Sequence, residues 1–591
     1  MLIGKTFVDP LEMPFSRRGS YICFANKNGG SNEFGKAQLW LATSRQRPND
    51  RNFGNIFNDN HFRQIQLEIV KDGFPRHCVI STTPYEIKLE SMFGSISFCI
   101  GDYKYAKCKS TDGLTLRLSP ASGGGVLRMA PIFDLLDGSW KTNFGNYSML
   151  FVPTTGTLQK GPGGSIELVP DANGVIEMVM EESLVDPKRR TSYLTYNESV
   201  AAVKADFNDF ANRIAPSFPE IYKECGMQAL WTTWGLTVIP DGETVYKHQM
   251  IKMIRSSFEA AYSWQQGMHA MFLSHDLKLA WELLLSCFDT QDSTGRIADS
   301  LAYCGAGDTM KPPIQGVGLL WLMEYRDITS LPKEEMEYLW NRMEKWTNFH
   351  LEYRDLDHDS IFENHNAAET GWEDGSYFRI GFPLASPDMN AYLALQEEAL
   401  AKLGRVIGKS ESVCRYWEKK SIDTVKKIIE MFWTNDGWTA VNIVTKERSK
   451  ATGIPLYCTL LLGKRLPQEI IDRSIEIIFS KPGFDTPFGL ASEMLDSPYF
   501  RHGWCSGSIA TPVQALMVIA FENCGRHDLA RMIAKKYLNT MVNHGLYHIH
   551  DTYTGEVEYK HVGFKFFGEQ ELFNSGWTAA TYIFLAEHYG N

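Results

Sequence analysis

The chain of 591 residues lacks the features of several narrow protein classes. No run of apolar residues approaches the roughly 18 that a membrane-spanning helix needs. The first ten residues, Met-Leu-Ile-Gly-Lys-Thr-Phe-Val-Asp-Pro, lack the apolar core and the small-residue cleavage site of a signal peptide. The sequence therefore predicts a cytoplasmic protein that is neither secreted nor bound to a membrane.

A basic surface is also lacking. The chain has 59 Lys and Arg against 70 Asp and Glu, a net charge of −11, and no basic run that could follow a phosphate backbone. We therefore expect no nucleic-acid partner.

Disulfide, metal and cofactor motifs are missing as well. The 11 cysteines are odd in number and contain no CxxC pair, which is typical of reduced thiols. No GxSxG, P-loop or HExxH motif occurs, nor does a GxGxxG follow a strand. The nearest metal-like group is His544, His548, His550 and Asp551, whose spacing is common by chance in loops. We expect no metal and no cofactor.

Aromatic residues, by contrast, are abundant. The chain has 15 Trp, 25 Tyr and 34 Phe, with 44% hydrophobic and 22% charged residues, as in a globular protein. So many rings indicate large cores, or clefts lined by flat apolar faces of the kind that sugars stack on.

The N-terminal third has the pattern of a β-sandwich. Short β-favouring runs separated by Gly, Asn, Asp and Pro predict strands over 37–43, 64–70, 77–82, 85–90, 95–100, 114–118, 147–152, 165–169 and 175–180. We therefore expect an antiparallel β-sandwich over residues 1–196.

The rest of the chain has helical periodicity. A helix over 198–214 is expected to link the domains, within a linker over 197–224. Further helices are predicted over 251–261, 277–287, 315–325, 333–353, 387–407, 411–432, 467–479, 511–523, 529–543 and 577–588. Recurring helices of this kind predict hairpins arranged in a ring or stack over residues 225–591.

The loops between these helices carry the candidate chemistry. The segment 365–378 places Glu369, Glu373 and Asp374 beside Trp372. A carboxyl group held against an aromatic ring is poorly solvated, so its pKa rises toward that of a general acid. An acidic surface loop with a half-buried Trp explains the same residues.

Cleavage of a glycoside needs a second carboxylate, and the loop 568–577 supplies Glu569 and Glu571. The two carboxyl groups would lie about 5–5.5 Å apart for retention and about 6.5–9.5 Å apart for inversion.

The order of several motifs resembles a known group, the (α/α)6-barrel glycosidases that include trehalase, glucosidase I and mannosylglycerate hydrolase. The resemblance covers about residues 225 to 591. It rests on Tyr262-Ser-Trp-Gln, Lys311-Pro-Pro-Ile-Gln-Gly, Glu369-Thr-Gly-Trp-Glu-Asp, Pro387-Asp-Met-Asn-Ala-Tyr-Leu, Thr486-Pro-Phe-Gly-Leu, Gly503-Trp and Ser575-Gly-Trp-Thr-Ala-Ala. It implies an (α/α)6 toroid that follows the β-sandwich along the chain. It also implies inverting hydrolysis of an α-linked, glucoside-type bond in a small saccharide or glycoside, without a cofactor.

The resemblance assigns the acid to Glu373, where the group has Asp. Because Glu is one methylene longer, the neighbouring Asp374 remains an alternative acid. The chain departs from the group again after Trp264, where Gln265 replaces a common Asp.

The base is the larger departure. The group carries its catalytic Glu shortly before a Thr-Gly pair, and here His548 stands near that position. Three alternatives follow: Glu571 or Glu569 is the base, His548 replaces the carboxylate, or the protein binds a sugar without cleaving it. We favour Glu571, since a carboxylate activates water without becoming cationic.

The remaining candidates would contact the sugar. Trp264, Trp372 and Trp504 are candidate stacking platforms. Candidate polar partners are Gln265, His269, Lys311, Gln315, Asp388, Asn390, His502, His548 and Glu569. Each also has a structural explanation: a Trp at a helix end is often a core residue, and Asp388 is also expected as a helix N-cap.

Two further functions compete with a glycoside hydrolase. One is a polysaccharide lyase or an atypical glycosidase that uses the His548 loop. The other is a catalytically inactive carbohydrate-binding protein. The motifs leave open the sugar, the linkage and the oligomeric state.

Overall fold

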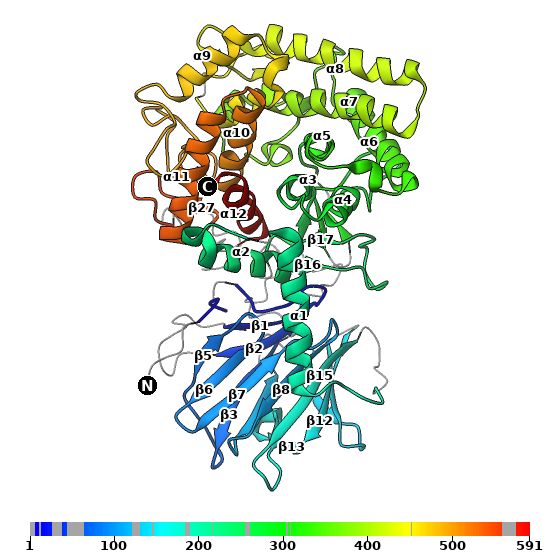
Figure 1. Cartoon of the computed structure of the whole chain (residues 1–591), viewed down its shortest axis with the longest axis vertical. Coiled ribbons are helices and arrows are strands. Elements are labelled where there is room, and N and C mark those ends of the chain that lie inside the picture. The colour runs from blue at the N-terminus through cyan, green and yellow to red at the C-terminus, as the bar shows by residue number, and fades with distance from the viewer. Residues whose placement is uncertain are drawn as a thin grey trace.

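The structure is a computed structural model that describes residues 6–10, 13–26, 38–43, 64–120, 131–144, 147–183, 190–215, 217–254, 260–302, 305–307, 309–450, 452–557 and 575–591. Two sheets form the N-terminal part, a ring of helices forms the C-terminal part, and helix α1 (Tyr196–Ile214) runs between them (Figure 1). The predicted order of an antiparallel β region followed by a helical region is confirmed. The predicted boundaries at residues 196 and 224 stay predictions.

Both sheets of the N-terminal part are antiparallel. The first has the strand order β1-β2-β3-β9-β14-β13 with β4 paired to β3, and the second has the order β10-β11-β12-β15-β8-β7-β6-β5. The first sheet contains β1 (Ile22–Asn26), β2 (Leu39–Thr43), β3 (Gln64–Lys71), β4 (Phe74–Pro75), β9 (Thr115–Pro120), β13 (Thr157–Lys160) and β14 (Ile166–Val169). The second contains β5 (Val79–Thr82), β6 (Ile87–Ser91), β7 (Gly94–Cys99), β8 (Tyr105–Ser110), β10 (Ile132–Asp134), β11 (Trp140–Phe144), β12 (Tyr147–Thr155) and β15 (Ile176–Ser183).

The two sheets share one apolar core. Leu67 of the first sheet and Phe98 of the second are both buried, and β3 and β14 of the first sheet contact β6 and β15 of the second, as expected for a sandwich. The sequence pattern missed β8 because Lys107 occupies a strand position. Its ammonium is buried and lies 2.6 Å from a carboxylate oxygen of Glu177 on β15. A lysine that is buried through an ion pair with another strand interrupts the alternation of apolar residues by which a strand is predicted.

The helical part is a closed ring of paired helices. Its inner elements are α3 (Ser263–Phe272), α5 (Gln315–Tyr325), α7 (Pro387–Ile407), the 3-10 segment η7 (Ile454–Arg465), α10 (Thr511–Asn523) and α12 (Gly576–Tyr589). Each inner element contacts the next, and α12 contacts α3, which closes the ring. The outer layer contains α2 (Lys223–Leu236), α4 (Leu277–Ser286), α6 (Lys333–Tyr353), α8 (Glu411–Phe432), α9 (Gln468–Ile478) and α11 (His527–His544). The alternation of outer and inner elements along the chain is that of the predicted (α/α)6 toroid.

The inner helices pack closely because small residues stand at their contacts. A Cβ added to Gly316 of α5 would lie 2.2 Å from the Cα atom of Gln396 on α7. Only glycine fits this crossing, so any larger residue would push α5 and α7 apart.

Most predicted helices have the expected bounds, but the helix predicted over 251–261 is wrong. The ends of that range lie in β17 (Met250–Ile251) and β18 (Ala261–Tyr262), and α3 begins at Ser263. All ten residues of α3 are buried, so its polar residues do not mark a solvent-exposed face. The sequence pattern also missed α2, in which residues 229–236 are all buried.

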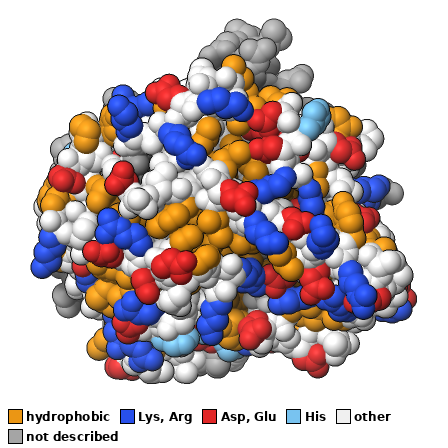
Figure 2. Space-filling view, turned by 90° about the horizontal axis from the view of Figure 1, so that it is seen from above, with side chains coloured by type: hydrophobic (Ala, Val, Ile, Leu, Met, Phe, Trp, Pro, Cys, Tyr) orange, Lys and Arg blue, Asp and Glu red, His pale blue; other side chains and the backbone are white. Residues whose placement is uncertain are grey.

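Charges of both signs are interspersed on the face of the ring seen from above, rather than gathered into a field of one sign (Figure 2). Pairs one helical turn apart on α8 illustrate this, with 3.0 Å between Arg415 and Glu411 and 2.7 Å between Lys419 and Asp423. In the part of the chain that the structure describes, every helix is too short or too polar to cross a membrane.

Candidate functional site

The first turns of the inner helices meet at one end of the ring, which we call the site rim. Gln315, which begins α5, donates from Nε2 to the carbonyl oxygen of Ser263, which begins α3 (3.5 Å). The Oγ atom of Ser575, the N-cap of α12, lies 3.3 Å from Nδ1 of His548. The carbonyl oxygen of His548 accepts a bond from Thr511, which begins α10 (3.1 Å). Residues distant in the sequence therefore converge at this rim.

Aromatic rings fill the rim. Trp264 packs edge-on against Trp372 and Trp577, with ring centroids 4.8 Å apart in both pairs. Trp264 and Trp372 are 2% and 0% exposed, so neither presents a face to solvent and both fit the structural explanation. Trp504 is half-buried and stacks on His548, with centroids 4.6 Å apart and planes 9° apart. Trp504 thus remains the better stacking candidate.

The loop 365–375 is anchored to the rim through its backbone. Gly371 has φ 75°, and a Cβ there would lie 2.3 Å from the ring of Trp264. Trp504 donates from Nε1 to the carbonyl oxygen of Gly371 (2.9 Å). Glu369 is buried and lies 2.8 Å from a guanidinium nitrogen of Arg354. Glu369 is therefore committed to holding the loop in place.

Glu373 is the carboxylate of this loop that reaches solvent. Its side chain is 38% exposed, and its Oε1 atom lies 2.6 Å from Nζ of Lys311. The same ammonium donates to the carbonyl oxygen of Ala368 (2.6 Å). Lys311 therefore fixes the position of Glu373 relative to the loop.

Asp374 points away from Glu373, toward the loop that carries Trp504. Its Oδ1 accepts a bond from the backbone nitrogen of Cys505 (2.6 Å), and its Oδ2 accepts one from Ser506 Oγ (2.7 Å). Burial raises the pKa of Asp374, although these two bonds and Arg501 oppose the rise. Both oxygens are occupied, so Asp374 joins the two loops of the rim.

Asp388 and Asn390 lie in the first turn of α7. Trp372 donates from Nε1 to Asp388 Oδ2 (3.1 Å), while Oδ1 is buried and has no hydrogen-bond partner within the described residues. Burial raises the pKa of Asp388 to about 6. Asn390 bonds to the backbone of Phe362 in both directions, and its amide also donates to the carbonyl oxygen of Ser386. Asn390 therefore holds the backbone, which fits the structural explanation for this candidate.

The other polar candidates on inner helices are buried. Gln265 and His269 of α3 are 2% and 0% exposed, and burial lowers the pKa of His269 to about 3. The Gln315 carboxamide accepts from Nε1 of Trp346 (3.3 Å) while donating to Ser263. Gln265 and His269 lie in the wall behind the rim, whereas Gln315 joins the starts of α5 and α3 at the rim.

Only one of the three candidate bases, His548, lies in the part of the chain that the structure describes. His548 is 1% exposed, and burial lowers its pKa to about 3, so the ring is neutral. His502 is partly exposed, with Nδ1 3.4 Å from Asp551 Oδ2. Glu569 and Glu571 lie outside the described residues.

Glu493 is a rim carboxylate that sequence reasoning missed. It is fully buried and accepts bonds from three hydroxyl groups, those of Ser376 (2.6 Å), Thr452 (2.5 Å) and Ser497 (2.8 Å). Its partners come from three separate segments, so no local motif marks it. Glu493 fastens the end of the 365–375 loop to η7 and its neighbours.

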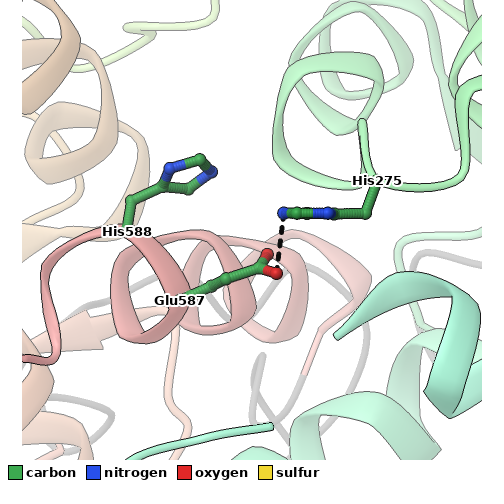
Figure 3. A group of neighbouring side chains, drawn as sticks. All are labelled: His275, Glu587 and His588. Carbon is green, nitrogen blue, oxygen red and sulfur yellow. Dashed lines mark ion pairs between the residues drawn. The ribbon is translucent and has the colours of Figure 1, made fainter. Parts of the chain in front are cut away.

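One His and Glu group could hold a metal by composition. His275, Glu587 and His588 offer ligand atoms within 4.8 Å of one another, from the α3–α4 connection and the end of α12 (Figure 3). They lie at the end of the ring opposite the rim, where these helices end rather than begin. His275 Nε2 is 2.7 Å from Glu587 Oε1, and the nearby cationic Arg326 acts on all three side chains. A polar contact between α12 and α4 explains the group better than a cation beside Arg326.

Solved structures with a similar arrangement share little sequence with this chain. The GH63 mannosylglycerate hydrolase from Thermus thermophilus in complex with glucose is 15% identical, with a TM-score of 0.48, over 55% of this chain and 92% of that chain. The neutral trehalase from Saccharomyces cerevisiae is 15% identical, with a TM-score of 0.46, over 58% of this chain and 74% of that chain. A sialidase is 12% identical, with a TM-score of 0.49, over 95% of this chain and 60% of that chain.

A comparison with curated proteins found no match to this chain. A family of glycoside hydrolase domains, the mannosylglycerate hydrolase MGH1-like domains, matches residues 259–568, more than half of the chain. The match spans α3 to α11 and the 365–375 loop, and it confirms the resemblance that the ordered motifs predicted. The chain belongs to the mannosylglycerate hydrolase MGH1-like glycoside hydrolase family.

Proposed function

We propose that this glycoside hydrolase cleaves an α-linked bond in a small saccharide or glycoside with inversion, using Glu373 as the general acid. The family supports glycoside hydrolysis, and the motif order supports the α-linked bond and the inversion. Glu571 is the proposed base.

The observation that carries the proposal is the exposure of Glu373. Three carboxylates lie in its loop, and the side chains of Glu369 and Asp374 are 5% and 8% exposed, against 38% for Glu373. A general acid must come within hydrogen-bond distance of the glycosidic oxygen. Of the three carboxylates, Glu373 is the one that a substrate can approach from solvent.

The neighbouring residues would then position the acid rather than transfer the proton. Lys311 holds one oxygen of Glu373, which leaves the other oxygen to meet the substrate. Asp374 ties the acid loop to the loop that carries Trp504. This arrangement places the acid and the stacking candidate on two loops that are fastened together.

A role for His548 as the base is less favoured. The ring is buried under Trp504, and its pKa is lowered to about 3, so it would be a weak proton acceptor. The lyase alternative depends on this loop and has no other support among the described residues.

The experiment combines a substrate panel with matched variants. Mannosylglycerate, trehalose and short α-glucosides are incubated with the protein, and NMR follows the anomer released. We expect the β-anomer from the sugar at the cleaved carbon, as inversion of an α-linkage requires, with an equal amount of α-glucose as the leaving group when trehalose is the substrate. Glu373→Gln and Glu571→Gln should each lower kcat by about 10²–10⁴-fold, while Glu334→Gln on the exposed face of α6 should not.

Each other outcome has a defined meaning. Full activity in Glu373→Gln would remove that residue as the acid, and early release of the α-anomer alone, with no β-anomer, would overturn inversion. Saturable sugar binding with no product over days would favour the inactive binding protein. An unsaturated product that absorbs in the ultraviolet would favour a lyase.

A further inference from the structure

Three aromatic rings lie together in the loops of the rim, outside the residues that the proposed reaction uses. Phe500 and His502 belong to the loop that carries Trp504, and Tyr553 follows β27 (Ile549–His550). The ring centroids of Phe500 and Tyr553 are 6.0 Å apart, and that of His502 lies 6.1 Å from Phe500 and 6.5 Å from Tyr553. We call Phe500, His502 and Tyr553 the outer aromatic cluster.

The fold joins the two loops that carry this cluster. β26 (Ile509–Ala510) pairs antiparallel with β27, so the loop before β26 and the loop after β27 leave the same end of this pair of strands. Thr552 donates from Oγ1 to the carbonyl oxygen of Gly507 (3.2 Å), and His502 Nδ1 lies 3.4 Å from Asp551 Oδ2. The two loops are therefore held against each other.

The turn that carries Tyr553 is fixed by Asp551. Oδ1 of Asp551 accepts bonds from the backbone nitrogens of Tyr553 (2.8 Å) and Thr554 (2.7 Å) and from the hydroxyl group of Thr554 (3.0 Å). The backbone nitrogen of Gly555 donates to the carbonyl oxygen of Asp551 (3.0 Å). An aromatic side chain on a turn held in this way loses little conformational freedom when a ligand covers it.

The cluster is not part of the hydrophobic core. Tyr553 is 61% exposed, and Phe500 and His502 are partly exposed beside it. Single rings on a surface need no explanation, but a group of them marks a binding surface.

The surroundings of the cluster favour a sugar over a protein or a lipid. Arg501 stands between Phe500 and His502 in the chain, and its side chain is 60% exposed. Its Nε donates to Ser506 Oγ (3.1 Å), which fixes the guanidinium at the edge of the cluster. A sugar ring has apolar C–H faces and an edge of hydroxyl groups, so it fits flat rings beside a fixed donor. The centre of a protein interface, by contrast, is depleted of charge.

The cluster also continues the surface that begins at the candidate acid. Asp374, the residue after Glu373, accepts bonds from Cys505 and Ser506. The loop of Cys505 and Ser506 also carries Trp504 and two members of the cluster. A saccharide whose cleaved bond lies at Glu373 therefore extends toward the cluster with its more distant sugar units.

We infer that Tyr553 and Phe500 form an outer sugar-binding subsite, with Arg501 as a donor to the sugar hydroxyl groups. The subsite narrows the substrate class to α-linked oligosaccharides of three or more units. Its place relative to the cleaved bond rests on the proposed function, because Glu373 defines where that bond lies. Binding of a sugar to the cluster does not depend on turnover.

The test compares saccharides of different length. α-Linked glucose and α-linked mannose oligosaccharides of two, three and four units are titrated calorimetrically into the full chain carrying Glu373→Gln. In one of the two series, the affinity should rise about five- to tenfold between two units and the longer sugars. Adding Tyr553→Ala should weaken binding of the longer sugars by the same factor and so remove the dependence on length.

Two further variants complete the design. Tyr553→Phe should keep the dependence on length, because stacking uses the ring rather than the hydroxyl group. Tyr416→Ala removes a Tyr that is 57% exposed on α8 and is the matched control, which should bind all the sugars as the parent chain does.

The inference would be overturned if neither series bound at millimolar concentration, or if the affinity did not rise with length in either series. Equal weakening of all lengths by Tyr553→Ala would likewise overturn the outer position of the subsite. Cleavage by Glu373→Gln would contradict the proposed acid instead, and the ratio of kcat/KM between chain lengths, with and without Tyr553→Ala, would then test the subsite.

Discussion

Replacing Asp388 with Asn should make the protein more stable and less active. Asp388 is fully buried at the start of α7, accepts a bond from Trp372 and leaves Oδ1 without a partner within the described residues. Asn keeps an acceptor for Trp372 and removes the buried charge. The variant therefore shows how much the buried charge lowers the free energy of unfolding and, separately, how much it contributes to activity.

The magnitude follows from the pKa. Burial raises the pKa of Asp388 from 3.8 to about 6, and one pKa unit corresponds to about 1.4 kcal/mol. The carboxyl ionises at lower pH in the unfolded chain than in the folded chain. The free energy of unfolding therefore falls as the pH rises from about 4 to about 6, and then levels off. Asp388→Asn should gain about 3 kcal/mol at pH 7 and less than about 1 kcal/mol at pH 4.

Activity should move in the opposite direction. A hydrogen bond to an ionised acceptor is roughly twice as strong as a neutral one, so Trp372 is held less firmly in the variant. Trp372 immediately precedes Glu373, and we expect kcat to fall about tenfold, as for a loss of about 1.4 kcal/mol. Sites that keep a costly charge for activity show this exchange of stability for function.

The assay pairs urea unfolding, followed by Trp fluorescence between pH 4 and pH 8, with the turnover measurement. The matched control is Glu397→Gln, on the same helix but away from the rim, where Thr424 donates to the carboxyl (2.8 Å). Burial raises the pKa of Glu397 to about 8, so this control should gain stability near pH 7 and keep its activity. A stability gain for Asp388→Asn that does not change with pH would refute the charge argument. Unchanged kcat would refute the positioning argument.

Three further substitutions probe the loops and the sandwich. Gly371→Ala would force a positive φ and a Cβ 2.3 Å from Trp264, so we expect a loss of about 2 kcal/mol or more and a matching fall in kcat, measured by urea unfolding and turnover. Asp374→Ala removes the acceptor for the backbone nitrogen of Cys505 and for Ser506 Oγ. In steady-state kinetics, we expect the fold decrease in kcat to exceed the fold increase in KM. Lys107→Met leaves the Glu177 carboxylate buried without its closest cation and should lower the free energy of unfolding by about 3 kcal/mol, with activity unchanged at temperatures where the chain is folded.

The sequence predicted most helices of the ring, including α6 and α8, which have one buried and one exposed face, and α10, which is buried along most of its length. The predicted ranges for α5, α6, α7, α8 and α10 agree with the structure to the residue. Helices α2 and α3 were missed although α10, which is similarly buried, was predicted, so burial alone does not hide a helix from the sequence. The strand β8 was missed because its lysine is neutralised by a residue on another strand. In β8, a partner distant in the chain changed what the local pattern means.

For the candidate site, the sequence by itself determined the family and the acidic loop that holds the candidate acids, because these are local motifs in a fixed order. Only the tertiary structure decided what each carboxylate does. Glu369 meets Arg354, Glu373 meets Lys311, and Asp374 meets the loop of Cys505 and Ser506. These partners lie up to 132 residues away along the chain. Three carboxylates within six residues look equivalent in a sequence, and they differ here because each lies in a different environment once the ring has closed.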